Sequence, residues 1–223
     1  MCFSAKASFA AAGALSIIGL ASVKQVRTKK LIPFALSPLF FALQQLSEGF
    51  VWITLMHGDT TSIMHWASVY TFLFFAAMFW PLWVPFSLYC IETIRTRKQI
   101  LSVFIWCGVG IALILLLYWI VRVKQAIIIN HHINYPIAYY PFGIDQKYSV
   151  VGAYILSLLY GIIIVAPFFI STLPYSKLLG FIIGMGALIA YIFYLVAFAS
   201  VWCFFAAICS GMIYFIVRNY EKN

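Results

Sequence analysis

The chain has 223 residues, of which 65% are hydrophobic, 19% aromatic and only 9% charged. Soluble domains carry about 25% charged residues, so this composition excludes a soluble globular protein and indicates one that crosses the lipid bilayer several times. The formal net charge of +9 does not indicate a nucleic-acid partner, because basic residues that flank apolar segments follow from the positive-inside rule. The five cysteines include no C-x-x-C pair and are too scattered for a disulfide framework.

Seven apolar segments are long enough to cross a bilayer, which takes roughly 20 residues. Only Lys6 precedes the first segment and a basic cluster follows it, whereas a signal peptide carries its positive charge in front. We therefore predict a retained helix, with a cleaved signal peptide as the alternative. The segments cover approximately residues 7–23, 31–56, 63–89, 100–121, 148–170, 178–196 and 201–217.

Prolines and connections predict the irregular parts of the bundle. Pro81 and Pro85 lie in the second half of the third segment and predict a kink there. The longest connection, residues 122–147, has no helical period and is rich in isoleucine and aromatic residues, which suits an ordered outer loop at the headgroup level with room for short strands. Only a few small residues, 197–200, separate the last two segments, so one long helix is the alternative to a tight turn.

The basic residues predict the orientation. With the N-terminus outside, ten of the fourteen Lys and Arg residues fall in cytoplasmic connections, as the positive-inside rule requires. We therefore predict an all-α membrane protein with a single domain, residues 1–223, built as a seven-transmembrane-helix bundle with the N-terminus outside and the C-terminus cytoplasmic. The cytoplasmic residues are Lys24, Arg27, Lys29, Lys30, Arg95, Arg97, Lys98, Lys177, Arg218 and Lys222, and the outer ones are Lys6, Arg122, Lys124 and Lys147.

Small residues at four-residue spacing predict close helix packing. The clearest pair is Gly180 and Gly184 in the sixth segment, which would let two helix backbones approach each other. We predict packing inside one bundle, with a dimer interface as the alternative, and the oligomeric state stays open.

Glu48 is an acidic residue deep inside an apolar segment, where an ionisable group is expensive and marks a functional site by default. On a helical wheel it shares one stripe with Gln44, Gln45 and Trp52, and that stripe must face protein or water. Eight residues separate Glu48 from Met56, which places it about 12 Å below the outer surface. We predict a buried polar pocket in the outer half of the bundle. The alternative is a structural clamp in which neutral Glu48 bonds to the neighbouring amides.

Histidine and cysteine side chains gather toward the same end. All four histidines fall on the outer side under the predicted orientation, as does Cys2. Imidazole, thiolate and carboxylate groups are the ligands of zinc, copper and iron, so we predict a transition-metal or cofactor site, although no H-x-x-x-H or H-E-x-x-H spacing is present. Interfacial histidines without a metal, or a disulfide between Cys2 and Cys203, are the alternatives. The predicted ligands are Cys2, Glu48, His65, His131 and His132.

Several cofactor classes are excluded. The last segment has no lysine, so no retinal Schiff base can form there. No C-x-x-C-H is present for covalent haem, and no glycine-rich phosphate-binding loop is present.

The opening Met1-Cys2-Phe3-Ser4-Ala5, together with Gln44-Gln45-x-x-Glu48-Gly49-x-x-Trp52, resembles a bacterial family of small multipass membrane proteins that begins MCFSA and is catalogued as a domain of unknown function. The segment His132-Ile133-Asn134-Tyr135 is similar to a further pattern of that family. The resemblance implies a protein of the bacterial inner membrane. It implies that Cys2, Gln44, Gln45, Glu48 and Trp52 belong to what the family shares, and it implies no activity.

Three functions remain open. The first is a metal- or cofactor-binding membrane protein with redox or hydrolytic chemistry in the outer half of the bundle. The second is a proton or small-solute transporter or channel with Glu48 as the titrating group. The third is a non-catalytic membrane sensor, although the short cytoplasmic connections leave it little surface for signalling. The predicted partners are the lipid bilayer and a small ligand or metal ion.

Overall fold

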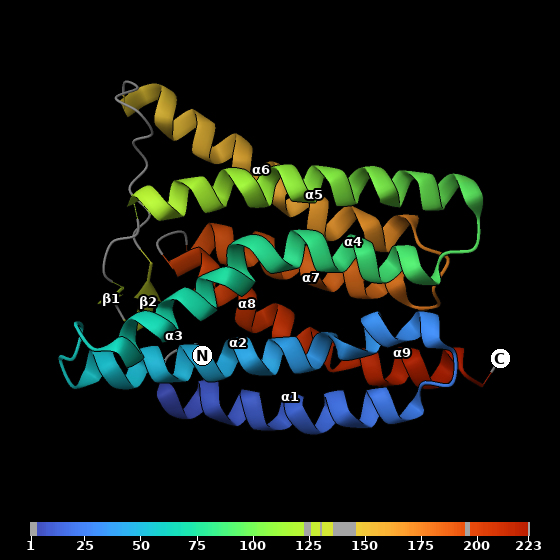
Figure 1. Cartoon of the computed structure of the whole chain (residues 1–223), viewed down its shortest axis with the longest axis horizontal. Coiled ribbons are helices and arrows are strands. Elements are labelled where there is room, and N and C mark those ends of the chain that lie inside the picture. The colour runs from blue at the N-terminus through green and yellow to red at the C-terminus, as the bar shows by residue number, and fades with distance from the viewer. Residues whose placement is uncertain (1–3, 123–125, 130, 136–145, 195–196, 223) are drawn as a thin grey trace.

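The computed structural model describes residues 4–122, 126–129, 131–135, 146–194 and 197–222. Long helices lie side by side along one common direction (Figure 1). The helices are α1 (Ala5–Gln25), η1 (Lys29–Leu31), α2 (Ile32–Met56), α3 (Ile63–Leu73), η2 (Phe74–Phe79), α4 (Trp80–Ile91), α5 (Arg95–Arg122), α6 (Gln146–Ile170), α7 (Ser176–Phe193), α8 (Phe198–Ser210) and α9 (Met212–Tyr220). The strands are β1 (Ile127–Ile129) and β2 (His132–Asn134).

The helices follow the predicted apolar segments closely. Within the described residues, six helical stretches are long and apolar enough to cross a membrane, and a shorter apolar helix covers Ile155–Ile170. That shorter helix belongs to the fifth predicted segment, so the count of seven crossings stays a prediction. The six stretches are Ala5–Gln25, Lys29–Met56, Ile63–Ile91, Arg95–Leu117, Ser176–Phe193 and Phe198–Tyr220.

Serine side chains begin two of the helices. Ser4 Oγ accepts a hydrogen bond from the Ala7 backbone N–H at 3.3 Å, and Ser62 Oγ accepts one from the His65 N–H at 3.1 Å. Each bond satisfies one of the N–H groups that a helix leaves unpaired in its first turn. These caps place the first residue of α1 and of α3 close to the predicted starts.

The third predicted segment bends before its first proline (Figure 1). The Trp80 N–H bonds to the carbonyl of Phe75, five residues back, in the π-helical turn η2. Because Pro81 has no N–H, the Ala76 carbonyl has neither an α-helical nor a π-helical donor. The Tyr160 hydroxyl of α6 donates to that carbonyl instead. The predicted kink is therefore a π-bulge whose unpaired carbonyl is satisfied by another helix.

The last two predicted segments are separate helices that pack together. Trp202 Nε1 of α8 donates to the Ile183 carbonyl of α7 at 3.3 Å, so one continuous helix is wrong. The final segment is itself divided, since α8 ends at Ser210 and α9 begins at Met212.

The long connection carries a small β-hairpin. Strands β1 and β2 pair antiparallel, with Ile128 opposite Ile133. Ile133 is fully buried in a cluster that includes Trp52 of α2 and Phe72 of α3. The short strands that the sequence allows in this connection are confirmed by the hairpin, which the isoleucine run supports because β-branched residues favour strands.

The small residues pack helices within the bundle. A Cβ added at Gly180 would lie 2.5 Å from the Cβ of Phe168, and one at Gly184 would lie 3.3 Å from Val165. Both contacts are made by α7 on α6, which agrees with the predicted internal packing.

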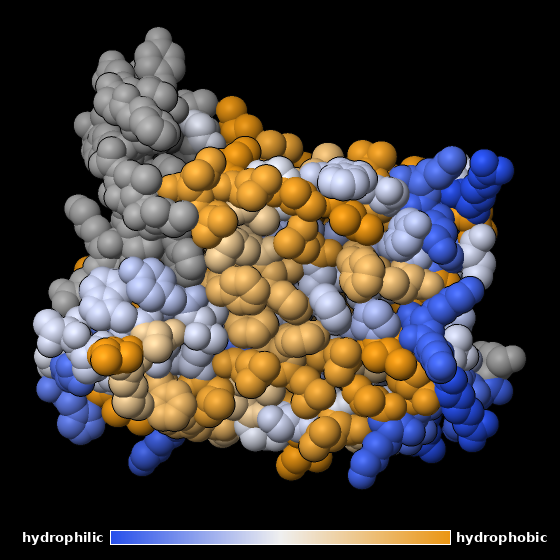
Figure 2. Space-filling view, viewed as in Figure 1, coloured by the Kyte–Doolittle hydropathy of each residue, from blue (hydrophilic) through white to orange (hydrophobic). Residues whose placement is uncertain are grey.

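Two carboxylates join the connections at one end of the bundle. The Glu92 carboxylate, at 2% exposure, accepts from the backbone N–H groups of Thr93, Ile94 and Thr172. Glu221 accepts from the backbone N–H of Thr28 at 2.9 Å. This same end, where the C-terminus lies (Figure 1), carries basic residues such as Lys24, Lys98 and Arg218, and Figure 2 shows a strongly hydrophilic surface there.

Candidate functional site

Glu48 lies in α2, completely buried. Its Oε1 accepts a hydrogen bond of 2.5 Å from the Ser200 hydroxyl of α8, while Oε2 has no hydrogen-bond partner. Among the described residues, no cationic side chain acts on the carboxyl group. An ionised carboxylate without a cation is very unfavourable in such surroundings, so the geometry favours a neutral carboxylic acid with one oxygen available.

The predicted pocket stripe faces α4 and α8. Trp80 Nε1 of α4 donates to Gln44 Oε1 at 2.7 Å, and the Trp80 ring stacks on Phe41 with ring centroids 3.8 Å apart. Cys203 of α8 is near enough to interact with both the Gln44 amide and the Glu48 carboxyl. The stripe is therefore buried by protein, as its polarity requires.

Several polar atoms around Glu48 have no partner. The unpaired buried atoms include Gln44 Nε2, both amide atoms of Gln45, and Trp52 Nε1. Gln45 does act on the Glu48 carboxyl, although no hydrogen bond of standard geometry joins the two side chains. Buried polar groups are paired in the great majority of cases, so this concentration on one stretch of α2 sets it apart from the rest of the fold.

His65 occupies the first turn of α3 and is completely buried. Its Nδ1 lies 2.8 Å from Thr54 Oγ1, and the same hydroxyl donates to the Val51 carbonyl at 3.0 Å. The hydroxyl has a single hydrogen, so the tautomer of the imidazole decides whether Nδ1 donates to Thr54 or accepts from it. The Nε2 atom has no hydrogen-bond partner.

The predicted metal ligands are not assembled by the described residues. Among those residues, no group of three His, Cys, Asp or Glu side chains could hold a metal ion. His131 sits exposed at the hairpin turn with a φ of 62°, and the ring of His132 packs against Tyr194. His65 is held by Thr54 instead. Cys2 lies outside the described residues, and Cys203 is a free thiol.

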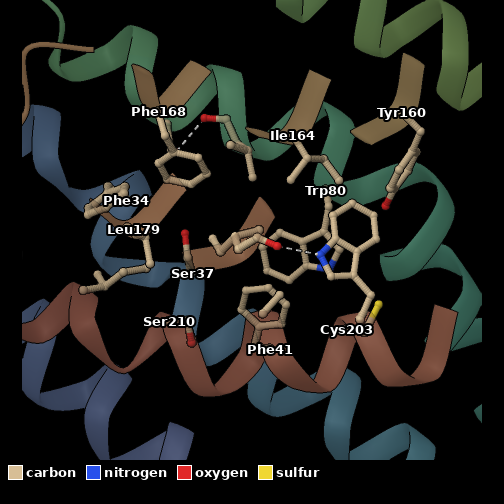
Figure 3. A pocket seen from close by; sticks show the side chains of 16 residues that line it. Phe34, Ser37, Phe41, Trp80, Tyr160, Ile164, Phe168, Leu179, Cys203 and Ser210 are labelled. Atoms are coloured by element: carbon tan, nitrogen blue, oxygen red, sulfur yellow. Dashed lines mark hydrogen bonds between the residues drawn. The ribbon is translucent and has the colours of Figure 1, made fainter. Parts of the chain in front are cut away.

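A cavity of about 50 Å³ lies beside this stripe, among five helices and α9. In Figure 3, Phe34, Phe168 and Leu179 line one side of it, and Tyr160, Trp80 and Cys203 line the other. The first group lies near the basic end of the bundle, and Cys203 borders the Glu48 stripe. The remaining lining residues are Ser37, Phe41, Val84, Ser87, Ile164, Ile183, Trp202, Ala206, Ser210 and Ile213.

Sequence reasoning missed this cavity and the partner of Glu48. Ser200 falls among small residues that suggested only a tight turn. The cavity serines, Ser37, Ser87 and Ser210, each sit alone among apolar neighbours and look like packing residues. Each of three helices contributes one of these serines to the cavity. That they border the same space becomes visible only once the positions of the helices are known.

Comparison with known proteins gives a family but no activity. A family model described as a family of unknown function, DUF6629, matches residues 1–223. The chain belongs to that family. No curated protein and no solved structure matches the chain. The predicted resemblance to a family of unknown function is therefore confirmed over the full sequence, and the function must be argued from the site.

Proposed function

We propose that this protein moves protons across a membrane, with Glu48 as the group that takes up and releases the proton. The observation that carries the proposal is a fully buried carboxyl group with one oxygen held by Ser200 and the other unpaired. Ionisable residues inside membrane-spanning helices mark proton relays and ion paths. A solute whose transport is coupled to the proton would bind the neighbouring unpaired atoms, which are Gln44 Nε2 and the Gln45 amide.

The Ser200 contact suits a group that changes its protonation state. A hydroxyl can donate to an ionised carboxylate and also accept from a neutral acid, so Ser200 supports Glu48 in both states. The unpaired Oε2 leaves room for the proton to be delivered without first breaking a protein hydrogen bond.

The test is proton flux into liposomes that contain the purified protein and an enclosed pH-sensitive dye. A pH gradient should collapse faster than in protein-free liposomes, and Glu48→Gln should abolish the difference because the amide cannot carry the proton. Glu221→Gln is the matched control, since that carboxyl lies at the exposed end of the bundle. Equal flux through the wild type and Glu48→Gln, or no flux above empty liposomes, would overturn the proposal.

The membrane we propose is the bacterial inner membrane, with the N-terminus outside and seven crossings. The support is the gathering of basic residues, such as Lys29, Lys98 and Arg218, at one end of the bundle, which is the pattern of a cytoplasmic face. Glu48 then lies in the outer half, and the cavity extends toward the cytoplasm.

A metal or cofactor site is the second candidate, and the state of His65 favours it. A ring nitrogen held by a second group, with the other nitrogen bare, is the arrangement of a metal-ligating histidine. His65 has that arrangement, and Cys2 would have to complete a zinc, copper or iron site with Glu48. Elemental analysis of the purified protein tests it: a stoichiometric metal that His65→Ala removes supports this candidate, and its absence overturns it.

A further inference from the structure

Three serine hydroxyls from three helices border one small cavity. Ser37 comes from α2, Ser87 from α4 and Ser210 from α8. Ser87 and Ser210 donate to carbonyls of their own helices, which leaves their oxygen lone pairs available as acceptors. Ser37 Oγ accepts from Trp83 Nε1 at 3.1 Å, so its own hydrogen remains available as a donor. The cavity therefore offers both donors and acceptors.

Proline adds a further acceptor. The carbonyl of Phe34, which lines the cavity, would bond to the N–H of residue 38 in a regular helix. Residue 38 is a proline inside α2 and has no N–H. A water molecule needs a cavity of about 10–15 Å³ and two to four polar partners. At about 50 Å³, this cavity has the room for more than one, and the serine hydroxyls are the polar points of a lining that is otherwise mostly apolar.

Cys203 links the cavity to the surroundings of Glu48. Cys203 lines the cavity and interacts with the Glu48 carboxyl, and it lies one helical turn from Ser200, which bonds that carboxyl. The opposite side of the cavity is lined by Phe34 at the start of α2 and Leu179 at the start of α7. Both helices start at the basic end of the bundle.

We propose that this cavity holds a short file of water molecules that connects the basic end of the bundle to Glu48, with Cys203 as the boundary. This inference rests on the proposed function of Glu48 and names the route by which its proton exchanges. Each transfer along the file breaks one O–H bond and forms another, so no oxidant or reductant takes part.

The experiment measures the exchange of the Glu48 proton for deuterium. In infrared spectra the C=O band of a protonated carboxylic acid shifts when the protein is transferred from H₂O to D₂O, and the Glu48 band is identified by its loss in Glu48→Gln. Ser210→Val fills the cavity and should slow the exchange several-fold. Ser22→Val is the control, because Ser22 is also fully buried and also bonds its own helix but does not line the cavity. Cys203→Ala should speed the exchange, since it removes the boundary.

A second pair of variants covers the case in which Ser210→Val fails to fold. Ser37→Ala combined with Ser87→Ala removes two hydroxyls without adding volume and should also slow the exchange. Equal exchange in the wild type, the cavity variants and Ser22→Val would overturn the water file.

Silver ions give a readout that does not depend on Glu48. In a variant that keeps Cys203 as its only cysteine, aqueous Ag⁺ replaces the thiol hydrogen and releases a proton. If Ag⁺ reacts rapidly with Cys203 and Ser210→Val slows this reaction, the cavity contains water. This result would support the inference even if proton flux is absent and the proposed function fails. If Ag⁺ reacts slowly with Cys203 and no cavity variant changes the rate, the cavity is dry. This result would overturn the inference even if Glu48→Gln abolishes proton flux.

Discussion

Glu48 and Glu92 are two buried carboxyl groups with opposite surroundings. Glu92 receives hydrogen bonds from three backbone N–H groups and from the Thr172 hydroxyl, all of which favour its ionised form. Glu48 receives one from Ser200 and keeps an unpaired oxygen. The first carboxyl is therefore suited to fixing structure, and the second to exchanging a proton.

Glu92 should make the stability of the protein sensitive to acid. Burial raises the pKa of Glu92, but the N–H groups of Ile94 and Thr172 outweigh burial, so the pKa lies below its ordinary value of 4.5. A lowered pKa gives stability that is complete above pH 4.5 and is lost as the pH falls through the native pKa. Glu92→Gln should lower the free energy of unfolding at pH 7 by about 1.5–3 kcal/mol and should remove this acid dependence.

Unfolding in detergent micelles, followed by circular dichroism at pH 7 and at acid pH, measures both effects. Glu221→Gln is the control, because its exposed contacts with the backbone of Arg27 and Thr28 contribute little. The same acid dependence in Glu92→Gln and in the wild type would contradict the assignment.

The π-bulge shows how one element depends on another. Sequence predicts a kink near Pro81 because proline cannot donate, but it does not show where the orphaned carbonyl finds a donor. That donor, the Tyr160 hydroxyl, lies 84 positions away in the chain. The partners of Gln44 and Glu48 are likewise Trp80 and Ser200. Helical periodicity gives the face on which a residue lies, whereas its partner depends on which helices are neighbours.

Tyr160→Phe should destabilise the bundle, because it removes the hydroxyl that donates to the Ala76 carbonyl. It leaves a buried carbonyl unpaired, which costs about 1–3 kcal/mol. In a Pro81→Ala background the new N–H can bond to Ala76 or to Ala77, so the cost of Tyr160→Phe should become smaller. A double-mutant cycle on the free energy of unfolding measures this coupling, and strictly additive effects would contradict the bulge mechanism.

Gly108 and Gly110 form a matched pair on α5. A Cβ at Gly108 would lie 2.1 Å from the Pro81 carbonyl oxygen, while a Cβ at Gly110 would have nothing within 4 Å. Gly108→Ala should therefore push α5 from α4 and cost about 1–3 kcal/mol or more, whereas Gly110→Ala should stabilise by up to about 1 kcal/mol. Thermal unfolding of the two variants compares them, and an equal change in melting temperature would refute this close contact.

For the whole molecule, sequence anticipates the helix pattern well and the site only in part. The apolar runs and the flanking charges predict nearly every helix, because bilayer thickness fixes segment length. The stripe Gln44, Gln45, Glu48 and Trp52 is also buried as expected. The metal ligands were grouped by their side of the membrane alone, which says nothing about lateral position, and the structure keeps His65, His131 and His132 in different contacts.

The orientation gives a prediction for the entire chain. A fluorescent protein fused after Asn223 should fluoresce, and alkaline phosphatase fused there should be inactive, because the proposed orientation places the basic end in the cytoplasm. Moving the fusions to the hairpin after His131 should reverse both results. An active phosphatase at the C-terminus would show that the bundle has the opposite orientation.

The inward-turned carboxyl of Glu92 has an electrical consequence. Glu92 is only 2% exposed, so its negative charge lies beneath the surface. The lysines and arginines at the same end of the bundle face the solvent. The positive charge of the bundle is therefore concentrated at one end. When an elementary charge crosses a membrane with a potential of 100 mV, its energy changes by about 2.3 kcal/mol. In the proposed orientation, the inside-negative potential that drives protons inward also opposes the transfer of this cationic end across the membrane.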